Sequence, residues 1–342
     1  MYQQTIFPRW RGFNLLGMFC SQTSALNRGR APGYYDEEDF KMIADFGFDF
    51  VRLPLSYRVW GSGNDIFFID QQKLAQLDKA VEWGDKYGLH ISICMHRLPG
   101  YCINEDEIER VNLWTDEEAL EAAKAHWCAI AKRYKDINSA KLSFNVVNEV
   151  NYDVRLEQYM HVSKEIINAV RKISPQRLFV IDGVHDGDIP PVDQMLRLEN
   201  CGFSCRGYAP RGVTHYRSHI KAYDNIAPVW PGAVQVEKDG EITEWDRKKI
   251  DKMFGMYAAL ADNFKVGVHC SEMGCFNYTP HDIALHWLED VLNSLKSYNI
   301  GYALWNFRGV TGIMDSERGD VDYVKCGRHL LDRKMLKLLQ KY

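Results

Sequence analysis

Short apolar runs alternate with amphipathic helical patterns along all 342 residues of the chain. The runs are continuous and rich in β-branched and aromatic residues, which is typical of parallel strands buried on both faces. There are eight of them, at 11–16, 49–54, 89–95, 141–148, 177–183, 202–208, 266–272 and 301–306. This alternation most restricts the fold, because every run needs cover on both of its faces.

Helical periods fill the intervals between the runs. In 70–87, Leu74, Leu77 and Val81 fall on one stripe, and Gly88 follows as a stop signal. The other patterns share this spacing, more weakly in the last four, and occupy 116–134, 154–172, 280–297, 36–46, 192–199, 245–263 and 327–341.

Eight strands alternating with eight helices predict an α/β fold, a (β/α)8 TIM barrel. Its extended loops would follow strand three (96–114) and strand six (209–243). A doubly wound sheet is the structural alternative, but no GxGxxG motif follows an early strand. No linker or shift of composition interrupts the chain, so we expect a single domain over residues 1–342.

The net charge indicates which kinds of partner are expected, and cysteine usage indicates the cellular compartment. Lys and Arg number 42 against 46 Asp and Glu, a net charge of −4 that favours neither nucleic acid nor an anionic membrane as partner. We expect a monomer without a cofactor. Nine cysteines without a CxxC pair, and a beginning without an apolar signal segment, predict a cytoplasmic protein. A secreted protein whose signal had been removed is the alternative.

Polar and titratable side chains recur where the predicted strands end. In a barrel these ends meet at one rim, where active sites lie. The residues are Asn14, Arg52, His96, Asn148, Glu149, Tyr208, Glu272, Trp305 and Asn306. Each alone has a plainer interpretation, such as a solvated loop glutamate, a structural ion pair of Arg52 or a core position for Trp305. Their shared position in successive units favours a converging catalytic site.

Glu149 and Glu272, at the ends of strands four and seven, suggest glycoside hydrolysis. In retaining glycosidases two carboxyl groups stand roughly 5–5.5 Å apart, one protonated to assist the leaving oxygen and one ionised to attack. Two close carboxylates disfavour double ionisation, which separates these roles. Arg52 is expected to keep the attacking group ionised, and Tyr208 to donate a hydrogen bond to it.

At these residues the sequence resembles glycoside hydrolase family 5, the cellulase-type members of the large retaining clan. The similarity runs from about residue 10 to 340 and rests on RGFNL (11–15), FDFVRLPLSY (48–57), HRLPGYCIN (96–104), NLW (112–114), FNVVNEV (144–150), YAPRGVTH (208–215), VHCSEMG (268–274), ALWNFRGVTGIMDS (303–316) and LLDRKMLKLL (330–339). It implies a retaining hydrolase of β-linked glycans, with an endo-β-1,4-glucanase as the default. An exo-acting enzyme, an enzyme for a mannoside, galactofuranoside or arabinofuranoside, and a non-catalytic carbohydrate-binding barrel are the alternatives.

The resemblance also implies roles for single residues. Glu149 would be the acid/base and Glu272 the nucleophile. The further substrate-binding residues would be Asn148 at the sugar 2-hydroxyl, Arg52 bracing the nucleophile, His96, Tyr208 and His215 lining the reacting subsite, and Trp305 as its stacking floor.

Two positions depart from the family pattern. Val150 replaces the proline of the usual Asn-Glu-Pro, and Arg206 stands where the histidine of His-x-Tyr is usual, so Arg206 bears on which sugar is recognised. Trp230, on the long sixth loop, is either an added sugar platform or a residue that pins the loop. His215 and His219, four apart, lack a helix signal and a nearby carboxylate ligand, so no metal site is expected.

Overall fold

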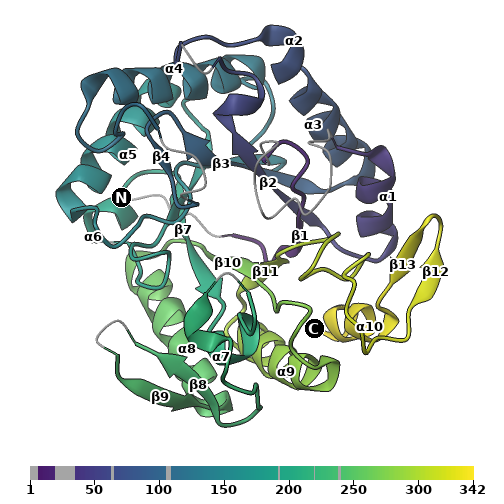
Figure 1. Ribbon diagram of the computed structural model, residues 1–342. Coiled ribbons are helices and arrows are strands. Elements are labelled where there is room, and N and C mark those ends of the chain that lie inside the picture. Colours follow the sequence, from purple (N-terminus) through teal and green to yellow (C-terminus); the bar gives the residue numbers. More distant parts are fainter. Residues whose placement is uncertain are drawn as a thin grey trace. The chain divides into compact units, whose positions relative to one another are not determined.

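The computed structural model describes residues 7–19, 35–62, 65–104, 109–191, 193–218, 220–237 and 240–342 (Figure 1). Within these ranges, each of the eight predicted runs overlaps a strand of one sheet. The strands are β1 Arg11–Asn14, β2 Phe50–Ser56, β3 His90–Leu98, β5 Leu142–Asn145, β6 Leu178–Asp182, β7 Cys201–Gly207, β10 Val268–Met273 and β11 Gly301–Leu304.

The order of the strands closes the sheet into a ring. It runs β2-β1-β11-β10-β7-β6-β5-β3, and β2 pairs again with β3. Pairing is parallel, as the register of β2 with β3 (Arg52 opposite Ser92) and of β3 with β5 (Cys94 opposite Asn145) illustrates. The predicted (β/α)8 barrel is therefore confirmed.

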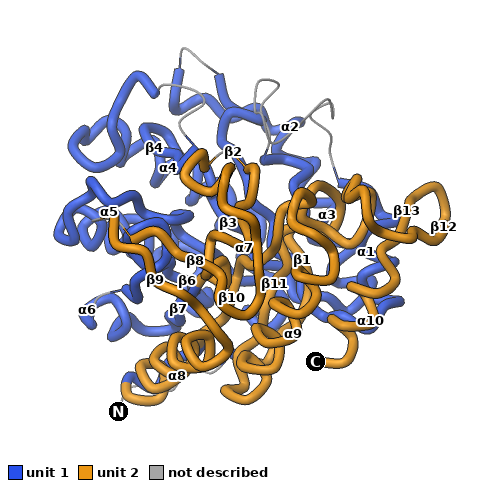
Figure 2. Tube along the Cα trace, turned by 60° about the horizontal axis from the view of Figure 1, so that its bottom comes forward, with its two compact units in different colours: residues 1–7, 15–205, 264–267 blue, residues 8–14, 206–263, 268–342 orange. Residues whose placement is uncertain are grey.

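The chain divides into two compact units (Figure 2). Unit 1, blue in Figure 2, comprises residues 1–7, 15–205 and 264–267, and unit 2, orange, comprises 8–14, 206–263 and 268–342. One of the boundaries along the chain, between Cys205 and Arg206, falls within β7. The expectation of a single domain is not tested by this division and stays a prediction.

Helices separate the strands as the amphipathic patterns predict. They are α1 Glu37–Asp45, α2 Gln71–Leu74, α3 Gln76–Tyr87, α4 Glu117–Arg133, α5 Leu156–Arg171, α6 Asp193–Leu196, α8 Arg247–Phe264, α9 His281–Ser297 and α10 Arg333–Lys341. Apolar stripes face inward, as in α5, where Tyr159, Val162 and Ile166 are buried.

Three predicted boundaries were wrong. The pattern at 327–341 begins inside a hairpin, at the turn between β12 (Val324–Cys326) and β13 (His329–Leu331). The helix α10 starts only after Asp332, whose carboxylate accepts from the Met335 N–H at 3.0 Å. The helix expected at 192–199 is the single turn α6. The strand expected to reach residue 148 ends at Asn145, which leaves three further residues to curve over the rim.

Both long loops follow the strands where they were predicted. The loop after β3 carries the two-residue strand β4 (Tyr101–Cys102), which pairs antiparallel with the end of β3. The loop after β7 carries α7 (Arg211–Thr214), the short 3-10 helix η3 (Lys221–Tyr223) and an antiparallel hairpin of β8 (Ala233–Val236) and β9 (Ile242–Trp245). Among the described residues, no helix has the length and apolarity to span a membrane.

His90, at the start of β3, predicts a pH dependence of stability. Its ring stacks on Phe50, with its nitrogens 2.9 Å from the Ala140 carbonyl and from the Ser143 hydroxyl. Burial lowers its pKa from 6.5 to about 4. Between these values the unfolded chain binds more protons, so the stabilisation is present above pH 6.5 and is lost as the pH falls towards 4.

Urea unfolding at pH 7 and pH 4.5 measures this contribution. Wild type should lose about 2 kcal/mol more between the two pH values than His90→Gln, which does not titrate. His161→Gln, at an exposed position of α5, serves as the matched control and should behave like wild type. Equal losses for wild type and His90→Gln would contradict this assignment.

Candidate active site

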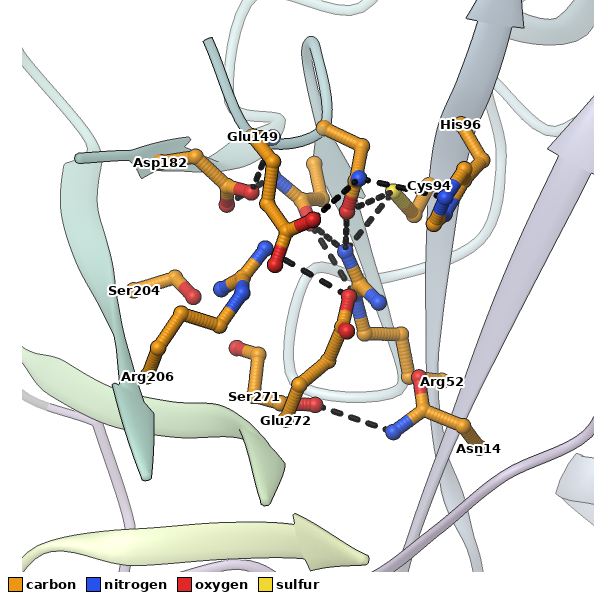
Figure 3. A network of polar contacts seen from close by, with 12 residues as sticks. Asn14, Arg52, Cys94, His96, Glu149, Asp182, Ser204, Arg206, Ser271 and Glu272 are labelled. Carbon is orange, nitrogen blue, oxygen red and sulfur yellow. Dashed lines mark hydrogen bonds and ion pairs between the residues drawn. The ribbon is translucent and has the colours of Figure 1, made fainter. Parts of the chain in front are cut away.

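Arg52 lies at the centre of the polar cluster in unit 1. It is fully buried within β2, and its guanidinium donates to Oδ1 of Asn145 at 2.9 Å and to Oδ1 of Asn148 at 2.7 Å (Figure 3). A third contact joins it to the Cys94 sulfur at 3.0 Å. A buried cation needs such partners, because without them its desolvation is unfavourable by several kcal/mol. Arg52 therefore fixes the amide of Asn145 at the end of β5 and that of Asn148 just after it.

Asn148 connects this cation to two neighbouring side chains. With its oxygen bound to Arg52, its Nδ2 faces Nε2 of His96 at 3.3 Å and Oε2 of Glu149 at 3.5 Å. Nε2 of His96 also lies 3.1 Å from Oδ1 of Asn104, on the loop after β3. Arg52, His96, Asn148 and Glu149, predicted together from their sequence positions, thus form one connected group.

Glu149 is half-buried, and its backbone is bound on both sides. Its φ of 36° lies in the left-handed region, which a residue with a side chain seldom adopts. Its N–H donates to Oδ2 of Asp182 at 2.9 Å, and its carbonyl accepts from the Tyr101 hydroxyl. Oδ1 of Asp182 in turn accepts from Nδ2 of Asn145 at 2.8 Å.

Glu272 is the buried carboxylate of unit 2. It lies in β10 with 3% of its surface exposed, and the Tyr208 hydroxyl donates to its Oε2 at 3.0 Å. The Arg206 guanidinium forms an ion pair with Oε1 at 3.4 Å (Figure 3). A cation and a hydroxyl donor together stabilise the negative charge that a nucleophilic carboxylate must carry.

A threonine of α7 orders the residues around Tyr208. The Thr214 hydroxyl donates to the Tyr208 carbonyl at 2.6 Å and lies 2.8 Å from Nδ1 of His215. Since the hydroxyl has one proton, Nδ1 of His215 is assigned as the donor to it. The His215 and Tyr208 rings meet edge to face at 5.4 Å. His215 thus belongs to the same group as Tyr208 and Glu272, and its expected place in the reacting subsite stays a prediction.

Two tryptophans of unit 2 have different surroundings. Trp305 follows β11 and is half-buried. Its backbone N–H donates to the Met273 carbonyl at 2.7 Å, which places Trp305 beside the end of β10. Trp230 is half-buried on the loop after β7, and its indole donates to Asp290 of α9 at 3.0 Å. That bond is what a residue that pins the loop requires.

Sequence reasoning placed one residue differently and missed others. Arg52 is the third residue of β2 rather than its end, and its long side chain brings the charge to Asn148. Arg206, which the sequence had assigned to sugar selection, forms an ion pair with Glu272, and the expected contact of Arg52 with Glu272 stays a prediction. Asp182 and Tyr101 were not singled out. The strand at 177–183 carried the available signal, because its only acidic residue, Asp182, stands directly before the closing glycine.

The described residues contain no group of three or more His, Cys, Asp and Glu side chains arranged to hold a metal ion. The pair of His215 and His219, at which no metal site was expected, is outside that test, since His219 is not among the described residues.

Comparisons with known proteins agree with the fold and with the sequence resemblance. The family model for cellulase (glycosyl hydrolase family 5) matches residues 11–309. Endoglucanase C of Acetivibrio thermocellus is 25% identical over 87% of this chain and 90% of its own length, and cellodextrinase A of Ruminococcus flavefaciens is 27% identical over 84% and 82%. A crystal structure of a glycoside hydrolase is 33% identical, with a TM-score of 0.87 over 97% of this chain and 99% of that one. The chain therefore belongs to glycosyl hydrolase family 5 and is a glycoside hydrolase.

Proposed function

We propose that this glycoside hydrolase is a retaining endo-β-1,4-glucanase with Glu149 as acid/base and Glu272 as nucleophile. The observation that carries the assignment is the contrast between the two carboxyl groups. Glu272 is buried against Arg206 and Tyr208, which stabilise its charge, whereas Glu149 is half-buried, and the Asn148 amide lies 3.5 Å from its Oε2. One group is thereby suited to remain ionised and the other to exchange a proton.

The reaction would proceed by double displacement. An oxygen of Glu272 bonds to the anomeric carbon while the bond to the leaving oxygen breaks and that oxygen takes the proton of Glu149. Water then attacks the same carbon and gives a proton to Glu149, and the bond to Glu272 breaks. Asn148 would hold the 2-hydroxyl beside the scissile bond, and Trp305 would stack beneath the sugar ring.

The choice of β-1,4-glucan is supported by the names of the relatives, an endoglucanase and a cellodextrinase. Arg206 is the residue on which a different sugar would depend, because it occupies the position next to the nucleophile where the family usually has histidine. Hydrolysis of carboxymethyl-cellulose, cello-oligosaccharides, mannan and aryl furanosides by wild type tests the choice directly. A preference for mannan or for a furanoside over every glucan would overturn it, and release of terminal units alone would overturn endo action.

Glu272→Gln should abolish turnover with little change of stability. Glutamine keeps the shape, and its oxygen can accept from Arg206 while its amide donates to the Tyr208 hydroxyl, but it is a poor nucleophile. The kcat on an aryl cellobioside should therefore fall on the order of 10³-fold or more. Thermal unfolding provides the control for folding. NMR of the first product formed by wild type should show the β anomer, and an initial α anomer would exclude the retaining mechanism.

Two variants of Trp230 distinguish its possible roles as a sugar platform and as a residue that pins the loop. Trp230→Phe keeps an aromatic face but loses the bond to Asp290, so a pinning residue should cost about 1 kcal/mol of stability with an unchanged KM for long oligosaccharides. Trp230→Ala should destabilise further, again with unchanged KM. An increased KM for Trp230→Ala that Trp230→Phe does not share would instead identify a sugar platform.

A further inference from the structure

The backbone of Glu149 is held by two side chains that sequence analysis did not single out. Asp182 accepts from its N–H at 2.9 Å, and the Tyr101 hydroxyl donates to its carbonyl. The same hydroxyl accepts from the N–H of Asn151 at 3.0 Å, so it bridges both sides of the turn that follows Glu149.

These bonds act on a residue in an unfavourable conformation. A φ of 36° places Glu149 in the left-handed region, where a residue with a side chain stays only if its surroundings fix it. The direction of the carboxyl group depends on that conformation. We propose that Tyr101 and Asp182 are positioning residues that clamp the Glu149 backbone and so aim its carboxyl group at the leaving oxygen, an inference that rests on the proposed acid/base role.

Tyr101 is itself rigidly placed. It belongs to β4, where it pairs with Leu98 across a turn at Gly100, whose φ is 83°. A side chain at Gly100 would meet the backbone of Leu113 at 2.5 Å, which keeps this turn tight. The Trp114 ring packs against Tyr101 edge to face at 4.8 Å. Burial raises the pKa of the Tyr101 hydroxyl well above its ordinary value, so it remains a neutral donor.

The loop that carries Tyr101 is fastened to the barrel by one carboxylate. Glu109 forms ion pairs with Arg97 at 3.0 Å and with Arg58 at 2.8 Å, and the Tyr57 hydroxyl donates to it at 2.8 Å. Arg97 lies in β3 and Tyr57 directly follows β2. The loop is thus tied to two barrel strands close to the hairpin of Tyr101.

Asp182 is fixed equally well at the end of β6. It is fully buried, its Oδ1 accepts from Asn145 at 2.8 Å, and its own carbonyl accepts from the Tyr159 hydroxyl at 2.8 Å. One carboxylate thus joins the end of β5 to the residue that the proposed mechanism uses as acid. The two halves of the clamp come from different strands, so each restrains Glu149 independently.

The dependence of the rate on the leaving group tests this role. A misdirected acid slows departure of a poor leaving group, whereas 2,4-dinitrophenolate leaves without a proton. For Tyr101→Phe, kcat/KM on cello-oligosaccharides should fall on the order of 100-fold, because misplacement by about 1 Å has effects of that size. On 2,4-dinitrophenyl cellobioside, kcat/KM should stay within about threefold of wild type.

The second step adds an independent measurement. Removal of the intermediate by water needs Glu149 as base, whereas azide attacks without one. With the dinitrophenyl substrate, azide should therefore increase kcat of Tyr101→Phe and yield a glycosyl azide. Asp182→Asn should give the same pattern, since an amide cannot accept from both Asn145 and the Glu149 N–H.

The controls distinguish a positioning role from loss of folding. Tyr134→Phe removes another buried hydroxyl of unit 1, which donates to Asp78 at 2.8 Å, and should leave both substrates unaffected. Circular dichroism and thermal midpoints show whether Tyr101→Phe and Asp182→Asn fold. The clamp would be overturned if folded variants showed the same decrease of kcat/KM on both substrates, or no decrease on cello-oligosaccharides.

Glu149→Ala separates this inference from the proposed function. If Glu149→Ala shows the leaving-group pattern and azide rescue but the clamp variants do not, only the clamp is wrong. If Glu149→Ala hydrolyses cello-oligosaccharides at the wild-type rate, Glu149 is not the acid/base and both proposals fail.

Discussion

The buried charge of Arg52 determines how the polar groups of unit 1 are oriented. Because the guanidinium can only donate, it requires the amide oxygens of Asn145 and Asn148 to face it. The nitrogen of Asn145 must then donate elsewhere and does so to Asp182, whose other oxygen accepts from the Glu149 N–H. The orientation of the Glu149 backbone thus depends on the Arg52 cation through two intervening residues, Asn145 and Asp182.

In unit 2 the buried charge is negative, and its partners are likewise fixed in orientation. Glu272 is as buried as a core residue, and carboxylates are seldom found there without a partner. Arg206 and Tyr208 lie two residues apart in sequence, at the end of β7 and directly after it, and both contact Glu272. The Thr214 hydroxyl fixes Tyr208 through its carbonyl. In each unit, a carboxyl group of the proposed mechanism is therefore oriented by residues whose own bonds leave them little freedom.

Much of this arrangement could be predicted from the sequence. Eight buried strands follow from runs that need cover on both faces, and polar residues at their ends mark the rim. The partners of each polar residue could not be predicted, because they depend on register. Asn145 meets Asp182 because β5 and β6 pair with Asn145 opposite Val180, two residues before the aspartate. The helix expected at 327–341 was too long for a related reason, since the apolar residues of β13 resemble a helical stripe until Asp332 caps α10.

Val150, the departure from Asn-Glu-Pro, fits the conformation of its neighbour. A proline at 150 would push Glu149 towards extended backbone, away from the left-handed φ of 36° that it adopts. With valine, residue 150 joins Val184 in a parallel bridge, and its carbonyl accepts from the Asp186 N–H at 2.9 Å. A proline limits the chain through its own ring, whereas here Tyr101 and Asp182 limit it from outside. Valine at position 150 leaves Glu149 free to adopt its left-handed conformation, and hydrogen bonds from Tyr101 of β4 and Asp182 of β6 hold it there.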